Sequence, residues 1–155
     1  MPNTKAYRVG TLSGKVLQVV SSYIPGTTSF STTSASYVDA TGFSLAITPT
    51  LNTSKILVIF DIGIVQGGSV ANNIYSSGQI LRDSTVTWTG TISGLAVGGS
   101  AISLELATNR PLIYLDSPAT TASTTYKLQV KRDTGTVVCN GGGLVSSITL
   151  IEIGA

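Results

Sequence analysis

One stretch of eleven residues, Lys55 to Val65, constrains the fold more than any other part of the chain. It is the most apolar run, and its β-branched side chains favour a pleated strand over a helix. Its large apolar residues recur at every second position and therefore share one side of the strand: Ile56, Val58, Phe60, Ile62 and Ile64. The opposite side is mixed and carries Asp61. We predict the central strand of a packed sheet, with the wholly apolar side facing the core.

Further short alternating stretches, separated by turn residues, occupy most of the chain. The clearest is Thr124 to Arg132, where Tyr126, Leu128 and Val130 alternate with polar side chains. In the last stretch, Ser147 to Ile153, both sides are apolar, which suggests that at least one of them contacts another subunit. No window has the three-and-four spacing of a helix. The pattern predicts an all-β fold, a single antiparallel jelly roll or β-sandwich of about eight to ten strands.

Glycine and proline mark the expected breaks between strands. We expect Gly67-Gly68-Ser69 to end the central strand, and the glycine-rich segment from Gly90 to Ser100 to form a surface loop. Pro111 should either precede a new strand or lie on a sheet edge, because proline has no N–H to donate. Asp133-Thr134-Gly135 should form a hairpin turn between two strands.

The first residues of the chain lack strand-length alternation. We therefore divide the chain into an N-terminal arm, residues 1–14, and one β-sandwich domain, residues 15–155. The arm carries Lys5, Tyr7 and Arg8. Chain termini are usually disordered unless something holds them, so an ordered arm would dock on a neighbouring subunit or another protein, or fold against its own domain. These three residues are the candidate docking residues.

Composition excludes several classes of function. Charged residues make up 10% of the chain and the net charge is +2, whereas about a quarter of residues are charged in an average soluble protein. The surface is therefore covered by uncharged polar residues or partly buried against other chains. The basic residues are scattered, so no nucleic-acid partner is predicted. The most apolar run is far shorter than the roughly twenty residues of a spanning helix, so no membrane span is predicted.

The sequence also offers little for catalysis or cofactors. It contains no His and one Cys, Cys139, which excludes imidazole-based triads, an internal disulfide and a Cys-rich zinc site. We interpret Cys139 as a small strand filler, and the central Asp61 as an acid paired with an Arg or with backbone donors. The tripeptide Asp133-Thr134-Gly135 occurs in aspartic proteases, but Lys131-Arg132 before it favour an exposed turn. No cofactor, metal or enzymatic activity is predicted.

A set of strand and turn segments carries a resemblance to a known family. These segments are Lys15–Val20, Phe30–Ser34, Tyr37–Asp39 with Thr41-Gly42, Ile47–Pro49 with Ser54–Val58, Leu81–Thr85, Tyr114–Pro118 with Thr124–Lys127, and Ser146–Ile153. Together they resemble a β-domain of virion surface proteins from tailed bacteriophages, especially aquatic and cyanobacterial ones, where it often ends tail-fibre chains. The resemblance covers residues 14–155 and rests on scaffold residues.

The resemblance implies a homotrimeric, non-enzymatic structural or attachment protein on the virion surface, and it supplies no catalytic residues. The sequence shows no shaft, heptads or repeats before the β-domain, which favours a capsid decoration (cement) protein that stabilises the shell. Its arm, with Lys5, Tyr7 and Arg8 as virion-docking residues, would then contact the major capsid protein. Two alternatives remain open. One is a tail-fibre or receptor-binding head, bound to another fibre protein, whose loops 67–73, 90–100 and 140–146 recognise host glycan; the other is an enzyme such as a glycan hydrolase.

Overall fold

The computed structural model describes residues 14–70, 74–95 and 102–155. Ten strands and one short 3₁₀ turn form within these ranges: β1 (Val16–Ile24), β2 (Phe30–Thr32), β3 (Val38–Ile47), β4 (Lys55–Val70), β5 (Ile74–Arg82), β6 (Thr85–Leu95), β7 (Ile102–Asp116), β8 (Thr124–Arg132), β9 (Thr136–Cys139), η1 (Gly141–Gly143) and β10 (Ser146–Ile153). Almost all of the predicted arm, with Lys5, Tyr7 and Arg8, lies outside the described residues.

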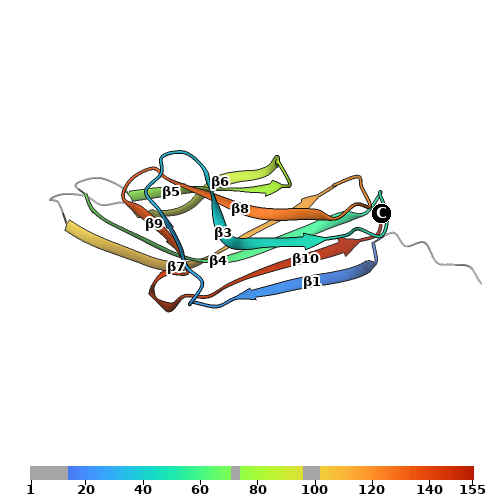
Figure 1. The fold of residues 1–155 in the computed structure, drawn as a ribbon, viewed down its shortest axis with the longest axis horizontal. Coiled ribbons are helices and arrows are strands. Elements are labelled where there is room, and N and C mark those ends of the chain that lie inside the picture. Colours follow the sequence, from blue (N-terminus) through green and yellow to red (C-terminus); the bar gives the residue numbers. More distant parts are fainter. Residues whose placement is uncertain (1–13, 71–73, 96–101) are drawn as a thin grey trace, which may run out of the picture.

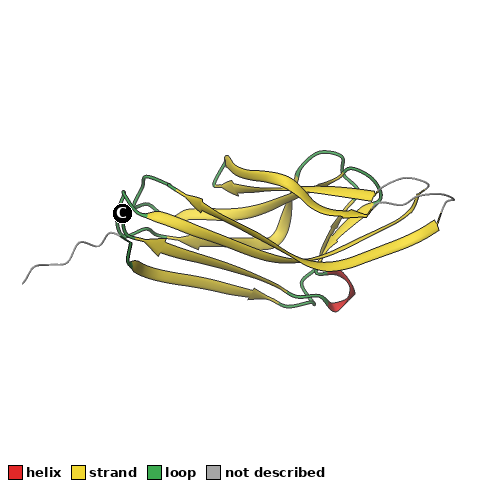
Figure 2. Ribbon diagram, turned by 180° about the vertical axis from the view of Figure 1, so that it is seen from behind, coloured by secondary structure: helices red, strands yellow, loops and turns green. Residues whose placement is uncertain are grey.

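The strands form two layers that pack face to face (Figures 1 and 2). The larger, six-stranded sheet has the order β1-β10-β4-β9-β2, with β7 along the other edge of β4. The smaller sheet has the order β3-β8-β5-β6. The strand pairings are antiparallel throughout. The prediction of an all-β antiparallel sandwich is confirmed. In the described parts of the chain, no helix is long and apolar enough to cross a membrane.

Strand β4 is the centre of the larger sheet, as its alternation predicts. It pairs with β10 and β9 on one edge and with β7 on the other. The alternating side chains Ile56, Val58, Phe60, Ile62 and Ile64 each have 0% exposure. They pack in one cluster with buried residues of the smaller sheet, which include Phe43, Ile80, Tyr126 and Leu128. Apolar burial between the two layers is thus what holds the sandwich together.

Two predicted strand breaks are wrong. β4 continues through Gly67 and Gly68 to Val70, because β7 pairs with it over that whole length. β6 runs through Gly90 to Leu95, because β5 pairs with it as far as its end. Pro111 lies inside β7 and does not begin a new strand. Because β7 pairs with β4 along one side and forms an edge of the sheet, the expectation of an edge position for Pro111 is correct.

The turn at Asp133-Thr134-Gly135 is not a hairpin. It connects β8 of the smaller sheet to β9 of the larger one, so the chain changes layers there. The backbone N–H groups of Asp133 and Thr134 donate to the carbonyl oxygen of Tyr75 at 3.0 and 3.2 Å, which fixes the crossing against β5. Gly135 adopts the left-handed φ of 75° that such a change of direction requires.

A polar cluster ties the two layers together near one end of β7. Asp116 of the larger sheet accepts hydrogen bonds from Arg82 Nη1 at 2.7 and 2.9 Å and from the hydroxyl of Tyr126 at 2.7 Å, both on the smaller sheet. The side chain of Arg82 is only 22% exposed and forms an ion pair with Asp116. Burial and the Asp116 hydrogen bond together raise the pKa of Tyr126.

Candidate functional site

The outward side of the larger sheet carries a continuous row of aliphatic side chains. Val19 of β1 lies opposite Ile151 of β10, Ile151 opposite Leu57 of β4, and Leu57 opposite Leu115 of β7. Because residues opposite each other in antiparallel strands point to the same side, the row crosses four strands without a polar interruption. Val19 and Leu115 are 56% and 50% exposed. A row of aliphatic side chains like this normally faces the interior of a sandwich, yet no helix or strand in the part of the chain that the structure describes covers it.

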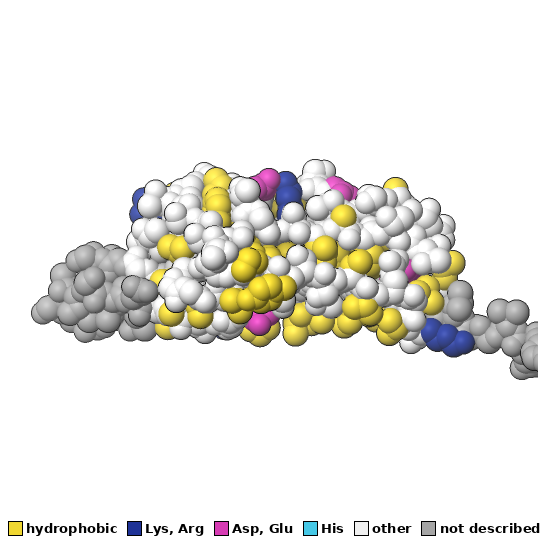
Figure 3. Space-filling view, turned by 60° about the horizontal axis from the view of Figure 1, so that its bottom comes forward, with side chains coloured by type: hydrophobic (Ala, Val, Ile, Leu, Met, Phe, Trp, Pro, Cys, Tyr) yellow, Lys and Arg dark blue, Asp and Glu magenta, His cyan; other side chains and the backbone are white. Residues whose placement is uncertain are grey.

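Neighbouring rows extend this apolar surface. Ile59 lies opposite Ile113 of β7, although the same row continues on its other side through two polar residues, Thr149 of β10 and Ser21 of β1. Ile153 lies opposite Val16 of β1. Ile113 and Val16 are 58% and 61% exposed. We call this surface the outer face and define it by Val16, Val19, Tyr23, Leu57, Ile59, Ile113, Leu115, Ile151 and Ile153. Figure 3 shows hydrophobic side chains gathered on the side of the molecule that β1 and β10 form in Figure 1, among mostly uncharged neighbours.

The area of the outer face is comparable with that of the largest apolar patches that typical monomers expose. It spans seven residues along β4, from Lys55 to Asp61, and four strands across. With a rise of about 3.3 Å per residue and a spacing of about 4.8 Å between strands, the planar area of this part of the sheet, polar residues included, is about 400 Å². Exposed apolar patches of about 300 to 600 Å² are the largest on typical monomers and often functional. The two-sided apolar pattern of Ser147–Ile153 had indicated such a contact.

Two charged residues of β4 border the outer face at opposite ends. Lys55 is exposed at one end. Asp61 is half-buried at the other, where it lies opposite Ser147 and accepts a hydrogen bond from Asn109 Nδ2 at 3.5 Å. The half-buried position of Asp61 agrees with the sequence prediction, but its partner is an amide side chain instead of an Arg or a backbone donor.

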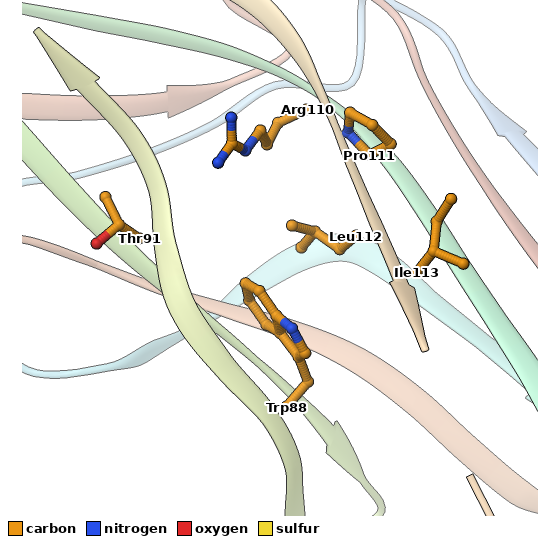
Figure 4. Close-up of a pocket in the computed structure, with 6 residues that line it drawn as sticks. All are labelled: Trp88, Thr91, Arg110, Pro111, Leu112 and Ile113. Atoms are coloured by element: carbon orange, nitrogen blue, oxygen red, sulfur yellow. The ribbon is translucent and has the colours of Figure 1, made fainter. Parts of the chain in front are cut away.

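A pocket opens beside the outer face, where the edge strands β6 and β7 of the two sheets run past each other. It has a volume of about 410 Å³ and is lined by Trp88, Thr91, Arg110, Pro111, Leu112 and Ile113 (Figure 4). The hydroxyl groups of Thr87 of β6 and Tyr114 of β7 meet at 2.7 Å and join the two strands. Burial raises the pKa of Tyr114 to about 12, so this bridge stays uncharged at neutral pH.

The carboxylates whose side chains the structure describes are engaged in structural hydrogen bonds. Beyond Asp61 and Asp116, these acids accept from the following groups: Asp39 from Lys127 and Gln129, Asp83 from the backbone N–H of Thr125, Asp133 from Ser77, and Glu152 from Gln18 and Thr50. No group of three His, Cys, Asp or Glu side chains that could hold a metal ion occurs within the described ranges.

Cys139 is a buried strand residue, as predicted. Its side chain has 0% exposure, and it forms no disulfide. Burial raises the pKa of its thiol to about 12. A thiol with so high a pKa is protonated at neutral pH and therefore a poor nucleophile.

The three residues predicted to dock on the virion are not placed by the structure, and neither are loop residues 71–73 and 96–100. The third predicted glycan loop, 140–146, is anchored at both ends by the buried Asn140 and Ser146, while Gly142, Gly143 and Val145 between them are exposed. Sequence reasoning missed the pocket entirely. Trp88 and Arg110 are 22 residues apart on strands of different sheets, and no local pattern connects them.

No protein-family model matches the chain, and no curated protein matches it. Among solved structures, it is similar to VP2 of infectious bursal disease virus in a subviral particle, with 13% identity and a TM-score of 0.40 over 90% of this chain. A structure of the Gx strain of that virus gives 17% identity and a TM-score of 0.41 over the same share. The chain spans only 38% and 37% of the length of these two proteins.

Proposed function

We propose that this protein is a non-enzymatic structural protein of a bacteriophage virion surface, a homotrimeric capsid decoration protein. The observation that carries the proposal is the outer face. A stable monomer rarely leaves several aliphatic side chains half or more exposed on one sheet face, because water around them costs free energy that a partner would recover. The partner that requires the fewest assumptions is a second copy of the same chain, since most soluble oligomers are symmetric assemblies of identical chains.

The composition supports burial of this surface between subunits. With 10% charged residues, the chain has few charges to keep exposed apolar surface in solution. The charges Lys55 and Asp61 lie at the two ends of the outer face and leave its middle, around Leu57 and Ile59, free of charge. This arrangement, with charges only at the rim, is that of a subunit interface.

The trimer and its place on the particle follow from the sequence resemblance to phage virion surface domains. A trimer presents three copies of each docking segment, so weak contacts by each arm add up to firm attachment. We propose that Lys5, Tyr7 and Arg8 contact the major capsid protein. The carboxylates that the structure describes are hydrogen-bonded within the fold, which supports a structural role in preference to that of a glycan hydrolase.

A tail-fibre head is the second candidate. It shares the trimer with the decoration protein and differs in where it is bound and in what it contacts. The pocket between β6 and β7 favours it, because a recognition protein needs a concave site on a rigid scaffold. In this alternative the partner would be another fibre protein in place of the major capsid protein.

Electron microscopy of virions with and without this protein tests the proposal. Density on the capsid lattice at hundreds of copies per particle, as icosahedral symmetry requires, is the expected result. Deletion of residues 1–13 should then release the protein from the capsid while leaving the trimer intact. Density at the tail alone would overturn decoration in favour of the fibre head. Density at neither place would overturn the virion role itself.

A further inference from the structure

The pocket beside the outer face has a built aromatic wall. Trp88 lies on the core-facing side of β6, opposite the buried Ile80 of β5. Its indole ring rests on Gly90, two residues further along the same side, where an added Cβ would come within 3.0 Å of the ring atom Cζ2. Gly90 thus leaves the space that lets the ring lie along the strand and form part of the pocket surface (Figure 4).

The opposite wall carries a cation in an unusual position. Arg110 lies opposite Ile62, whose side chain is completely buried, so Arg110 belongs to the core-facing row of β7 together with Leu112. The smaller sheet does not cover this position, and Arg110 is exposed at the pocket. Among the residues that the structure describes, no carboxylate pairs with it and no acceptor bonds to it. Its guanidinium therefore has all of its donors available.

Both polar and apolar groups line this space. Leu112 is 4% exposed and closes the bottom of the pocket, while Trp88, Pro111 and Ile113 supply further apolar surface. Arg110 and the hydroxyl of Thr91 supply the polar contacts, and Figure 4 shows both at the same end of the pocket. The volume of about 410 Å³ lies within the range of about 300 to 1,000 Å³ that ligand pockets have.

We propose that this pocket binds an acidic sugar residue, a uronic or sialic acid unit of a polysaccharide. The apolar face of the sugar ring would stack on the indole of Trp88, since aromatic rings combine an apolar face with a polar edge. The sugar carboxylate would accept two hydrogen bonds from Arg110, the geometry for which a guanidinium is suited. The hydroxyl of Thr91 can donate to or accept from a ring hydroxyl. This site goes beyond the proposed structural role and shares one residue, Ile113, with the outer face.

The intrinsic fluorescence of Trp88 provides a direct test, because it is the single Trp of the chain. The full-length protein would be titrated with galacturonate and, separately, with galactose, a pair that differs only in the carboxylate. We expect a saturable change in emission with galacturonate, and with N-acetylneuraminate as a second acidic probe, and a much smaller change with galactose. No saturable change with either acidic sugar at millimolar concentrations would overturn the proposal.

Two variants probe the two walls of the pocket. Arg110→Gln should weaken galacturonate binding about tenfold or more, because a charge-assisted bidentate contact is lost. Lys15→Gln removes the same charge from an exposed residue outside the pocket and should leave binding unchanged. Gly90→Ala, which displaces the ring, should weaken binding of the acidic sugar while Arg110 is intact.

An alternative explanation of Arg110 is edge protection, since inward-pointing charges on edge strands prevent unwanted strand pairing. If Arg110→Gln leaves galacturonate binding unchanged but causes the protein to associate through β7, the guanidinium protects the edge and the ligand proposal is wrong. All six lining residues come from one chain. A Leu115→Lys variant, made to prevent trimer formation, should therefore still bind galacturonate, so failure of the trimer and failure of the pocket are distinguishable.

Discussion

Asn140 and Gly63 are joined by a backbone hydrogen bond of 2.7 Å, from the Asn140 N–H to the Gly63 carbonyl oxygen. Gly63 is the position along β4 where the neighbouring strand changes from β10 to β9. A Cβ on Gly63 would lie 2.7 Å from the Cβ of Leu144, so the turn between β9 and β10 fits over this residue only because it is a glycine. The long strand β4 thereby pairs with two shorter strands, β10 and then β9, along the same edge.

The first prediction concerns the side chain of Asn140, which is 1% exposed and holds this junction. Its Nδ2 donates to the carbonyl oxygens of Ile24, Pro25 and Thr28 at 3.1 to 3.2 Å, and its Oδ1 accepts from Ser146. Asn140→Ala leaves these buried groups without partners and keeps a left-handed φ of 55° that Ala disfavours. We expect a loss of about 2 to 4 kcal/mol in the free energy of unfolding, measured with urea.

Asn52→Ala is the matched control for Asn140, because Asn52 is exposed in the connection between β3 and β4. It should change the free energy of unfolding by less than about 0.5 kcal/mol. An Asn140 variant as stable as this control would show that solvent or backbone adjustment replaces the side-chain hydrogen bonds.

The second prediction concerns subunit association through the outer face. Leu115→Lys introduces a charge at the β7 end of the aliphatic row, and because Leu115 is 50% exposed, the monomer should fold normally. Val86→Lys is the matched control: Val86 is 49% exposed but lies on β6 of the other sheet. Light scattering after gel filtration should give three times the chain mass of 15.9 kDa for the wild type and the control, and one chain mass for Leu115→Lys. Equal masses for both variants would argue against the outer face as the interface.

The third prediction concerns the reactivity of Cys139. Because its thiol is buried and has a pKa of about 12, a thiol reagent at neutral pH should label it only when the protein unfolds. An added thiol at an exposed position, Asn52→Cys, should react at once in the folded protein and serves as the control. Rapid labelling of Cys139 without denaturant would mean that β9 separates from β4 in the native state.

The period of two in Lys55–Val65 is enough to predict the central strand and its buried side, because burial of alternate residues is a local property of the chain. The ends of the strands are not local. β4 passes through Gly67 and Gly68 because a partner strand lies beside them, and the turn at Asp133 changes layers because β9 pairs with β4. Propensity favoured a break or a hairpin at these positions, and tertiary pairing overrides it.

The outer face and the pocket likewise depend on strand pairing and packing that local sequence patterns do not reveal. The sequence reveals that both sides of Ser147–Ile153 are apolar, but the row from Val19 to Leu115 exists only once four strands are in register. The mixed side of β4 contributes Leu57 to this row, although Asp61 on that side suggested partial polarity. Trp88 and Arg110 likewise come together only through the packing of two sheet edges.

Glu152 provides the last prediction, because it is an acid in the core-facing row of β10 with 0% exposure. Burial alone would raise the pKa of Glu152, but Ser54, Gln18 and Thr50 lower it, to about 2. Gln18 Nε2 donates to the carboxylate at 2.6 Å, and the backbone N–H and hydroxyl of Thr50 donate at 2.7 and 2.9 Å. The ionised carboxylate thus fastens β1 and the segment after β3 to β10.

The folded protein therefore holds the pKa of Glu152 below the ordinary value of 4.5, so the unfolded chain binds more protons between pH 4.5 and about 2. The stabilisation is complete above pH 4.5 and is lost as the pH falls towards 2, by about 3 kcal/mol for this group. Urea unfolding across this range measures it. Glu152→Gln should be less stable at neutral pH by about 1 to 3 kcal/mol, because its amide opposes the donors of Gln18 and Thr50. It should also lose less stability on acidification, the remaining slope coming from groups such as Asp39 and Asp133, whose pKa values are also lowered. An unchanged slope in Glu152→Gln would show that Glu152 is not the acid that controls stability at low pH.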